Sequence, residues 1–87
     1  IKITNPEITD WINEGSNVII SSESPDKNIA KVEFFGDGKS LGYCTTAPFS
    51  WVWFNIPKGK HEIKVTATDF NGNKNSSKSI NVFVHKN

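Results

Sequence analysis

Residues 61–69 read HEIKVTATD, a segment in which side chains of two kinds alternate without a break. The odd positions carry His61, Ile63, Val65 and Ala67, whereas the even positions before Asp69 carry charged residues or threonine. Successive side chains of a β-strand point to opposite faces, so a period of two predicts a strand with one face in a core and one in water. We therefore expect the odd positions, His61 included, to be buried.

The end of the chain repeats this alternation over residues 79–85. Asn71-Gly72 lies between the two alternating segments, and these residue types enter the positive-φ conformation of a tight turn at little cost. The sequence predicts a hairpin that joins the two segments directly. The inward positions expected on its second strand are Ile80, Val82 and Val84.

The rest of the chain is divided into short β-prone segments by turn residues that recur about every ten to twelve positions. No window of eleven or more residues keeps an apolar stripe at helical spacing. About seven short antiparallel strands bury their inward faces best in an all-β, two-sheet sandwich, with a small barrel as the alternative. The other inward residues expected are Ile1, Ile3, Val18, Ile20, Val32, Phe34, Leu41, Phe49, Trp51 and Trp53.

Composition excludes several classes of function. The 87 residues suffice for one domain over residues 1–87, with a thin core rather than a deep catalytic cleft. Ten lysines face nine acidic residues and arginine is absent, so we expect no nucleic-acid partner. Apolar runs are too short for membrane insertion. We expect a monomer without cofactors, and the start at Ile1 without a leader is typical of a processed piece or an excised module.

Four motifs follow one another along nearly the whole chain. They are Ile1-Lys2-Ile3-Thr4-Asn5-Pro6; Val32-Glu33-Phe34-Phe35-Gly36-Asp37-Gly38 with Leu41-Gly42; Thr45-Thr46-Ala47-Pro48-Phe49-Ser50 with Trp53; and Gly59 to His61 with Ile63, Ala67, Asp69, Gly72 and Asn73. In this order they resemble the bacterial immunoglobulin-like (Ig-like) modules of secreted multidomain proteins, especially glycoside hydrolases. The resemblance implies an Ig-like β-sandwich with Trp53 in its core, and a non-catalytic accessory module of an exported protein.

Residue types suited to a nucleophilic site are present but do not form one. Cys44 and His61 would supply a thiolate and its base, yet His61 is expected on a buried face and nothing supplies an oxyanion hole. The single cysteine also excludes an internal disulfide and a cysteine-based zinc site. We interpret Cys44 as an inert, partly covered thiol and expect no catalytic residues.

We do not expect a metal site. Asp69-x-Asn71-x-Asn73 resembles the start of a calcium loop, but the sixth and twelfth positions hold Lys74 and Ile80 in place of Gly and Glu. Asp69 is interpreted as a turn residue whose carboxylate accepts backbone N–H groups. Isolated acids leave one alternative open, calcium bound in the turns of Asp10, Asp26 or Asp37.

Three tryptophans and six phenylalanines raise the hypothesis of carbohydrate binding, because exposed aromatic rings stack on sugar faces. The candidate glycan contacts are Trp11, Phe35 and Tyr43. Phe35 falls on a mostly charged face, and no row of aromatic residues is spaced for a glycan chain. Weak carbohydrate binding through exposed aromatic residues is therefore the alternative function.

A candidate docking patch lies on an outer face. In residues 49–54, Val52 and Phe54 point away from the inward set, and Ile19 does so on an earlier strand. The two strands are commonly neighbours in an Ig sandwich, so the three apolar side chains would adjoin and orient an adjacent module. The alternative is that the segment Trp11–Ile12 folds over them, or that scattered apolar surface needs no explanation.

The sequence thus predicts a non-catalytic Ig-like accessory module that acts as a spacer, docking or stabilising unit. We expect it in a bacterial polysaccharide-degrading enzyme or surface protein, secreted or at the cell surface. Its expected partners are adjacent modules of the same polypeptide and polysaccharide.

Overall fold

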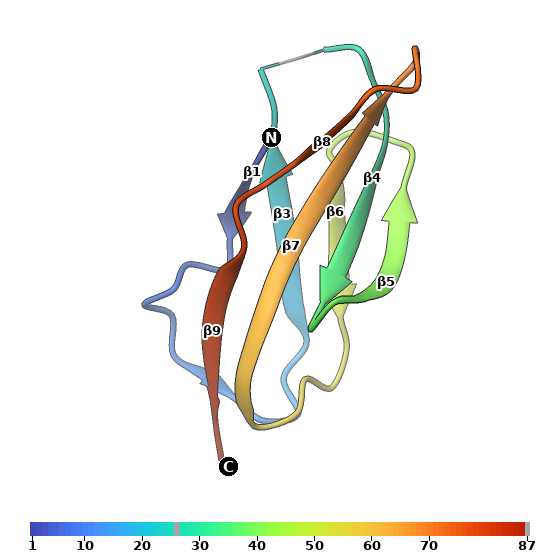
Figure 1. Cartoon of the computed structure of the whole chain (residues 1–87). Helices are drawn as coiled ribbons and strands as arrows, with labels where there is room; N and C mark the ends of the chain where they lie inside the picture. Colours follow the sequence, from blue (N-terminus) through green and yellow to red (C-terminus); the bar gives the residue numbers. More distant parts are fainter. Residues whose placement is uncertain (26, 87) are drawn as a thin grey trace.

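A computed structural model describes residues 1–25 and 27–86 and shows nine strands in two sheets, with no helix among these residues (Figure 1). A smaller sheet has the order β1-β3-β6, and a larger one has the order β2-β9-β7-β4-β5 with β8 paired to β7. The described residues contain no helix long and apolar enough to cross a membrane. The strands are β1 Lys2–Asn5, β2 Ile12–Asn13, β3 Val18–Glu23, β4 Ile29–Gly36, β5 Lys39–Cys44, β6 Ser50–Trp53, β7 Gly59–Asp69, β8 Lys74–Ser76 and β9 Ile80–His85.

The predicted all-β sandwich is confirmed, with a correction to its strands. Two separate sheets replace the barrel alternative. The expected seven strands become nine in the described part of the chain because of two short segments, β2 and β8. Nor are all pairs antiparallel, since β2 runs parallel to β9 with Ile12 opposite Val84. A two-residue strand has too few positions to show a period of two, so no alternation predicts β2.

The predicted strand at residues 61–69 is confirmed as the greater part of β7, the middle strand of the larger sheet. His61, Ile63, Val65 and Ala67 are all buried, as the alternation indicated. β7 is also the longest strand in Figure 1, where it crosses the molecule obliquely between β9 and β4. The buried side chains of β7 therefore form the middle of the larger sheet's inner face, and the rest of the core packs against them.

The hairpin prediction is right about the turn and wrong about the strand that follows it. Gly72 has a φ of 86°, and the turn joins β7 to β8 rather than directly to β9. The chain then leaves the β8 pairing at Ser77, which is buried and exchanges hydrogen bonds with Val65: its backbone N–H donates to Val65 O, and its Oγ accepts from Val65 N. Ser77 thus divides the second half of the hairpin into β8 and β9.

The core lies between the sheets and includes two residues outside the predicted inward set, Ile12 and Ile56. Trp51 and Trp53 pack against this core, as expected of Trp53, but both rings are only half-buried. They project from β6, which is an edge strand of the three-stranded sheet, and an edge leaves part of a large ring in water. The other core members are Val18, Ile20, Val32, Phe34, Ile63, Val65, Ala67, Val82 and Val84.

Candidate functional site

The three residues of the predicted docking patch lie on the outer side of the small sheet. β3 and β6 are antiparallel neighbours, and their register places Ile19 directly opposite Val52. Ile19 is 53% exposed and Phe54, two residues after Val52, is 69% exposed. Their neighbours on the inner side, Val18 and Ile20, are buried. Alternation along two paired strands therefore brings an apolar pair to the surface, with Phe54 just beyond it.

The turn after Phe54 is held by hydrogen bonds to the segment before β3. Asn55, at a φ of 53°, donates its backbone N–H to Asn17 Oδ1 at 3.1 Å. Ile56 exchanges backbone bonds with Gly15 and Ser16 and is itself fully buried. The exposed ring of Phe54 is thus carried by an ordered turn. The alternative of a covering Trp11–Ile12 segment does not hold, because this segment lies at β2, in the other sheet.

The predicted glycan contacts are dispersed across the six-stranded sheet. Trp11 precedes β2 at one edge, Phe35 lies on β4, and Tyr43 lies on β5 at the opposite edge. Four strand spacings of about 4.8 Å place Trp11 and Tyr43 roughly 19 Å apart. Phe35 is half-buried and lines a surface hollow with Glu62, and Tyr43 sits beneath the Lys31 ammonium at 5.4 Å. The structure does not bring these three rings together.

Trp11 instead lies against His85, which in turn contacts Phe83, and neither of these two residues was predicted as a glycan contact. Its indole stacks on the His85 ring with centroids 3.5 Å apart and planes 5° apart, and the His85 ring lies 5.1 Å from that of Phe83. Phe83 and His85 occupy the outer face of β9. Only the alternation of residues 79–85 signalled that their side chains face outward.

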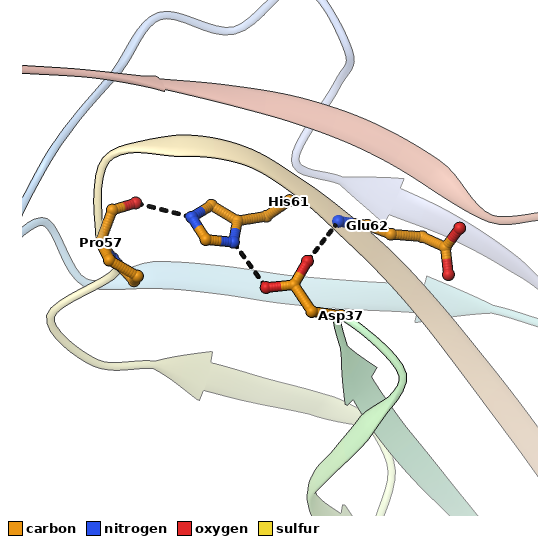
Figure 2. A network of polar contacts seen from close by, with 4 residues as sticks. All are labelled: Asp37, Pro57, His61 and Glu62. Atoms are coloured by element: carbon orange, nitrogen blue, oxygen red, sulfur yellow. Dashed lines mark hydrogen bonds and ion pairs between the residues drawn. The ribbon is translucent and has the colours of Figure 1, made fainter.

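A buried histidine forms the main polar network of the molecule (Figure 2). His61 lies between Pro57, in the loop before β7, and Asp37, in the turn between β4 and β5. Its Nε2 donates to Pro57 O at 2.7 Å, and its Nδ1 lies 2.6 Å from Asp37 Oδ2. The other carboxylate oxygen accepts the backbone N–H of Glu62 at 2.9 Å. The network fastens a turn and a loop to the start of β7.

The chemistry of this network is structural. Partial burial acts to raise the pKa of Asp37, but the hydrogen bonds from His61 and Glu62 outweigh it and hold that pKa below its ordinary value. A carbonyl and an ionised carboxylate both only accept, so both nitrogens of His61 are engaged when each carries a proton. Neither nitrogen of His61 faces a nucleophile.

Cys44 is far from this histidine. Cys44 pairs with Val32 on β4, whereas the His61 network adjoins Gly36 at the end of the same strand. Val32 and Gly36 are four residues apart, a distance of roughly 13 Å along the strand. The thiol is half-buried and directed at Thr46 O, 3.1 Å away. The structure therefore does not bring Cys44 and His61 together.

Asp10 and Asp69 accept hydrogen bonds from backbone N–H groups. The Asp69 carboxylate accepts the N–H groups of Asn71 and Asn73 at 2.9 Å each, which confirms its predicted role in the turn. The Asn73 bond lowers the pKa of Asp69 more than any other contact. Asp10 accepts the N–H of Glu7, and Asp26 lies outside the described residues. Over residues 1–25 and 27–86, no three His, Cys, Asp or Glu side chains are grouped so as to hold a metal ion.

Two sheets packed across a shared core define an Ig-like β-sandwich module. The profile of the bacterial Ig domain matches residues 1–65, and the chain belongs to this family. A solved structure of fibronectin(III)-like modules of CbhA from Clostridium thermocellum is similar, with a TM-score of 0.87 and 26% sequence identity. The alignment covers 99% of this chain and 96% of that one. The comparison with curated proteins gives no match.

Proposed function

We propose that residues 1–87 form a single accessory domain that spaces and orients neighbouring modules in a bacterial extracellular or surface protein. It has no catalytic role of its own, and its parent is a polysaccharide-degrading enzyme or surface protein. Family membership and the likeness to the fibronectin(III)-like modules of CbhA support this proposal. The domain acts as a monomer whose partners are the adjacent modules.

The observation that carries this function is the apolar surface of Ile19, Val52 and Phe54. Ile19 and Val52 are cross-strand partners on the outside of a sheet, where water-facing positions are otherwise polar: the next outward pair is Ser21 opposite Ser50. Contacts between domains of one chain need only a modest area. Phe54 is suited to such a contact because its ring is exposed while its backbone is fixed by the adjoining turn.

The shape of the molecule supports a spacer. Its principal extents are 44 × 20 × 19 Å, so it is about twice as long as it is wide. β1 begins in the upper half of Figure 1 and β9 runs to the lower end, so the chain enters and leaves at separated points of the long axis. A neighbour joined after β9 would lie at the end of the molecule where Figure 1 shows the loop between β6 and β7, and Phe54 is the first residue of this loop.

The test compares two exposed phenylalanines in the parent polypeptide, Phe54 in the patch and Phe70 in the turn after β7. Phe54→Ser should leave the stability of the 87-residue chain within about 0.5 kcal/mol of wild type, because the ring is mostly in water. In the parent polypeptide the same change should speed proteolysis between this module and its neighbour. It should also increase the radius of gyration measured by small-angle scattering. Phe70→Ser should change neither. Equal behaviour of the two variants would refute docking through this patch.

A further inference from the structure

The aromatic side chains at the β2 edge of the six-stranded sheet form a surface of their own, which we name the Trp11 platform: Trp11, His85 and Phe83. The indole of Trp11 covers the His85 ring at 3.5 Å, in nearly parallel planes. His85 also contacts Phe83, whose ring is tilted by 55° to the His85 ring. Three rings thus follow one another on the outer face of β9 and its neighbour.

The outermost ring is both exposed and fixed in orientation. Trp11 Nε1–H donates to Asn13 Oδ1 at 3.1 Å, and one face of the indole rests on His85. The residue is nevertheless 72% exposed, so its free surface is the opposite face of the indole and its edges. A ring held from behind and from the side loses little further freedom when a ligand packs on it, which favours binding.

Attachment of β2 to the sheet does not account for Trp11. Ile12 is already buried against the core beside Val84, and the backbone N–H of Glu14 donates to His85 O at 2.8 Å. These contacts already attach the β2 segment to β9. An indole added to them buries little of its own surface, so its stacking on His85 orients a ring toward solvent rather than completing the core.

The surroundings of the platform are polar. Lys60 is the cross-strand partner of Phe83, and Glu62 is that of Asn81, one alternation further along the same face. Asn13 lies beside His85, with its amide at the edge of the indole. The ammonium and carboxylate groups therefore lie at the Phe83 end of the platform, whereas the Asn13 amide adjoins the indole itself and can combine hydrogen bonding with stacking on the free face of Trp11.

We propose that the Trp11 platform is a subsite for one pyranose ring of a polysaccharide. The axial C–H groups of such a ring form an apolar face that packs on the negative π-face of the indole, and a hydroxyl at its edge is placed to hydrogen-bond the Asn13 amide beside the indole. A protein partner fits less well, since the apolar area is limited to a few rings and is bordered by charges of both signs. This inference goes beyond spacing and docking and does not depend on them, because Ile19, Val52 and Phe54 lie on the other sheet.

Native electrophoresis of the 87-residue chain in gels containing hydroxyethylcellulose, xylan or glycol chitin tests the subsite. At least one polymer should retard the wild type, and Trp11→Ala should weaken that binding by about tenfold or more, the equivalent of about 1.4 kcal/mol. The matched control is Tyr43→Ala, which removes another exposed ring from the far edge of the same sheet and should bind as the wild type does. Trp11→Phe keeps a smaller ring and should bind with intermediate strength.

His85 is a positioning residue in this proposal, and its test separates stacking from folding. His85→Phe retains a flat support and should keep binding, whereas His85→Ala should weaken it while the circular dichroism melt remains cooperative. Trp fluorescence should shift on adding the retarding polymer in the wild type and not in Trp11→Phe. Absence of retardation in all three gels, equal loss in Trp11→Ala and Tyr43→Ala, or a Trp11-dependent dimer in sedimentation would each overturn the proposal. None of these results bears on Phe54, so the docking function is tested separately.

Discussion

The indole of Trp53 lies against the backbone of Gly36, and a single methyl group at Gly36 tests whether this contact fixes how the two sheets meet. A Cβ built at this position would lie 2.7 Å from Cη2 and 2.8 Å from Cζ3 of the indole. Carbon atoms in contact prefer about 3.5–4.0 Å, so Gly36→Ala requires a relative movement of roughly 1 Å. The backbone at Gly36 has no positive φ that would add strain of its own.

Trp53 has little room to make this movement. Its ring meets the edge of His61 at a centroid distance of 5.3 Å, and both nitrogens of His61 are hydrogen-bonded, one to Asp37 and one to Pro57. Overpacking of this kind costs about 1–3 kcal/mol, against a gain of about 0.4–1 kcal/mol from restricting the unfolded chain. We expect Gly36→Ala to lose about 1–2 kcal/mol net and, for a domain of this size, to lower Tm by about 5–10 °C.

Urea and thermal denaturation of a small set of variants measure this cost. Trp53→Phe shortens the ring, so adding Gly36→Ala to Trp53→Phe should cost clearly less than adding it to the wild type, and the double-mutant cycle should show coupling. Gly38→Ala is the control for backbone strain alone, because Gly38 has a φ of 80° and nothing lies within 4 Å of its Cβ position. An unchanged or raised Tm for Gly36→Ala, or additive effects in the cycle, would refute the reasoning.

Two further predictions concern the turns. Gly72→Val should destabilise the chain by more than about 1 kcal/mol in urea melts, because a β-branched residue avoids the positive φ of 86° that Gly72 adopts; an unchanged midpoint would contradict this. Asp37 has a pKa lowered by folding from an ordinary value of 3.8, so its contribution to stability is present above that pH and is lost as the pH falls through the lower folded value. The Tm deficit of Asp37→Asn should therefore shrink below about pH 4, and a deficit that is constant from pH 2 to 7 would show that the carboxylate is not the group responsible.

Sequence reasoning succeeded where a residue's environment depends on its own strand. The burial of His61 and Val65 follows from a period of two, and the outward position of Ile19 follows from the same rule. It failed where the environment depends on a register between distant segments. Trp11 meets His85, 74 positions away in sequence, only because the two-residue strand β2 pairs in parallel with β9, and no local pattern encodes that pairing.

Long-range geometry also decided the role of the polar residues. Alternation predicts that His61 is buried but indicates no partner for its ring, and in the sequence Asp37 is an isolated acid in a turn. The turn at Asp37 is brought to β7 by the pairing of β4 with β7, which ends at Gly36 opposite Ile63. That pairing supplies the Asp37 carboxylate to Nδ1, and no polar side-chain atom buried in the described residues is left without a partner. The contact between His61 and Asp37, 24 positions apart, therefore cannot be predicted until the strand register is known.

The two proposed contact surfaces lie on opposite outer faces of the sandwich, and the core separates them. Packed sheets lie about 10 Å apart, so a group bound on Trp11 does not touch Phe54 on the other sheet. Sites separated by more than about 7–10 Å without shared partners act additively. In the six-stranded sheet, β7 lies next to β9 and its outward side chains are charged residues and threonines, whereas Ile19 and Val52 form an apolar pair on the central strand and one edge strand of the three-stranded sheet. A neighbouring module seated on the small sheet would thus leave the proposed subsite open and would hold the aromatic edge of this domain in a fixed direction relative to that neighbour.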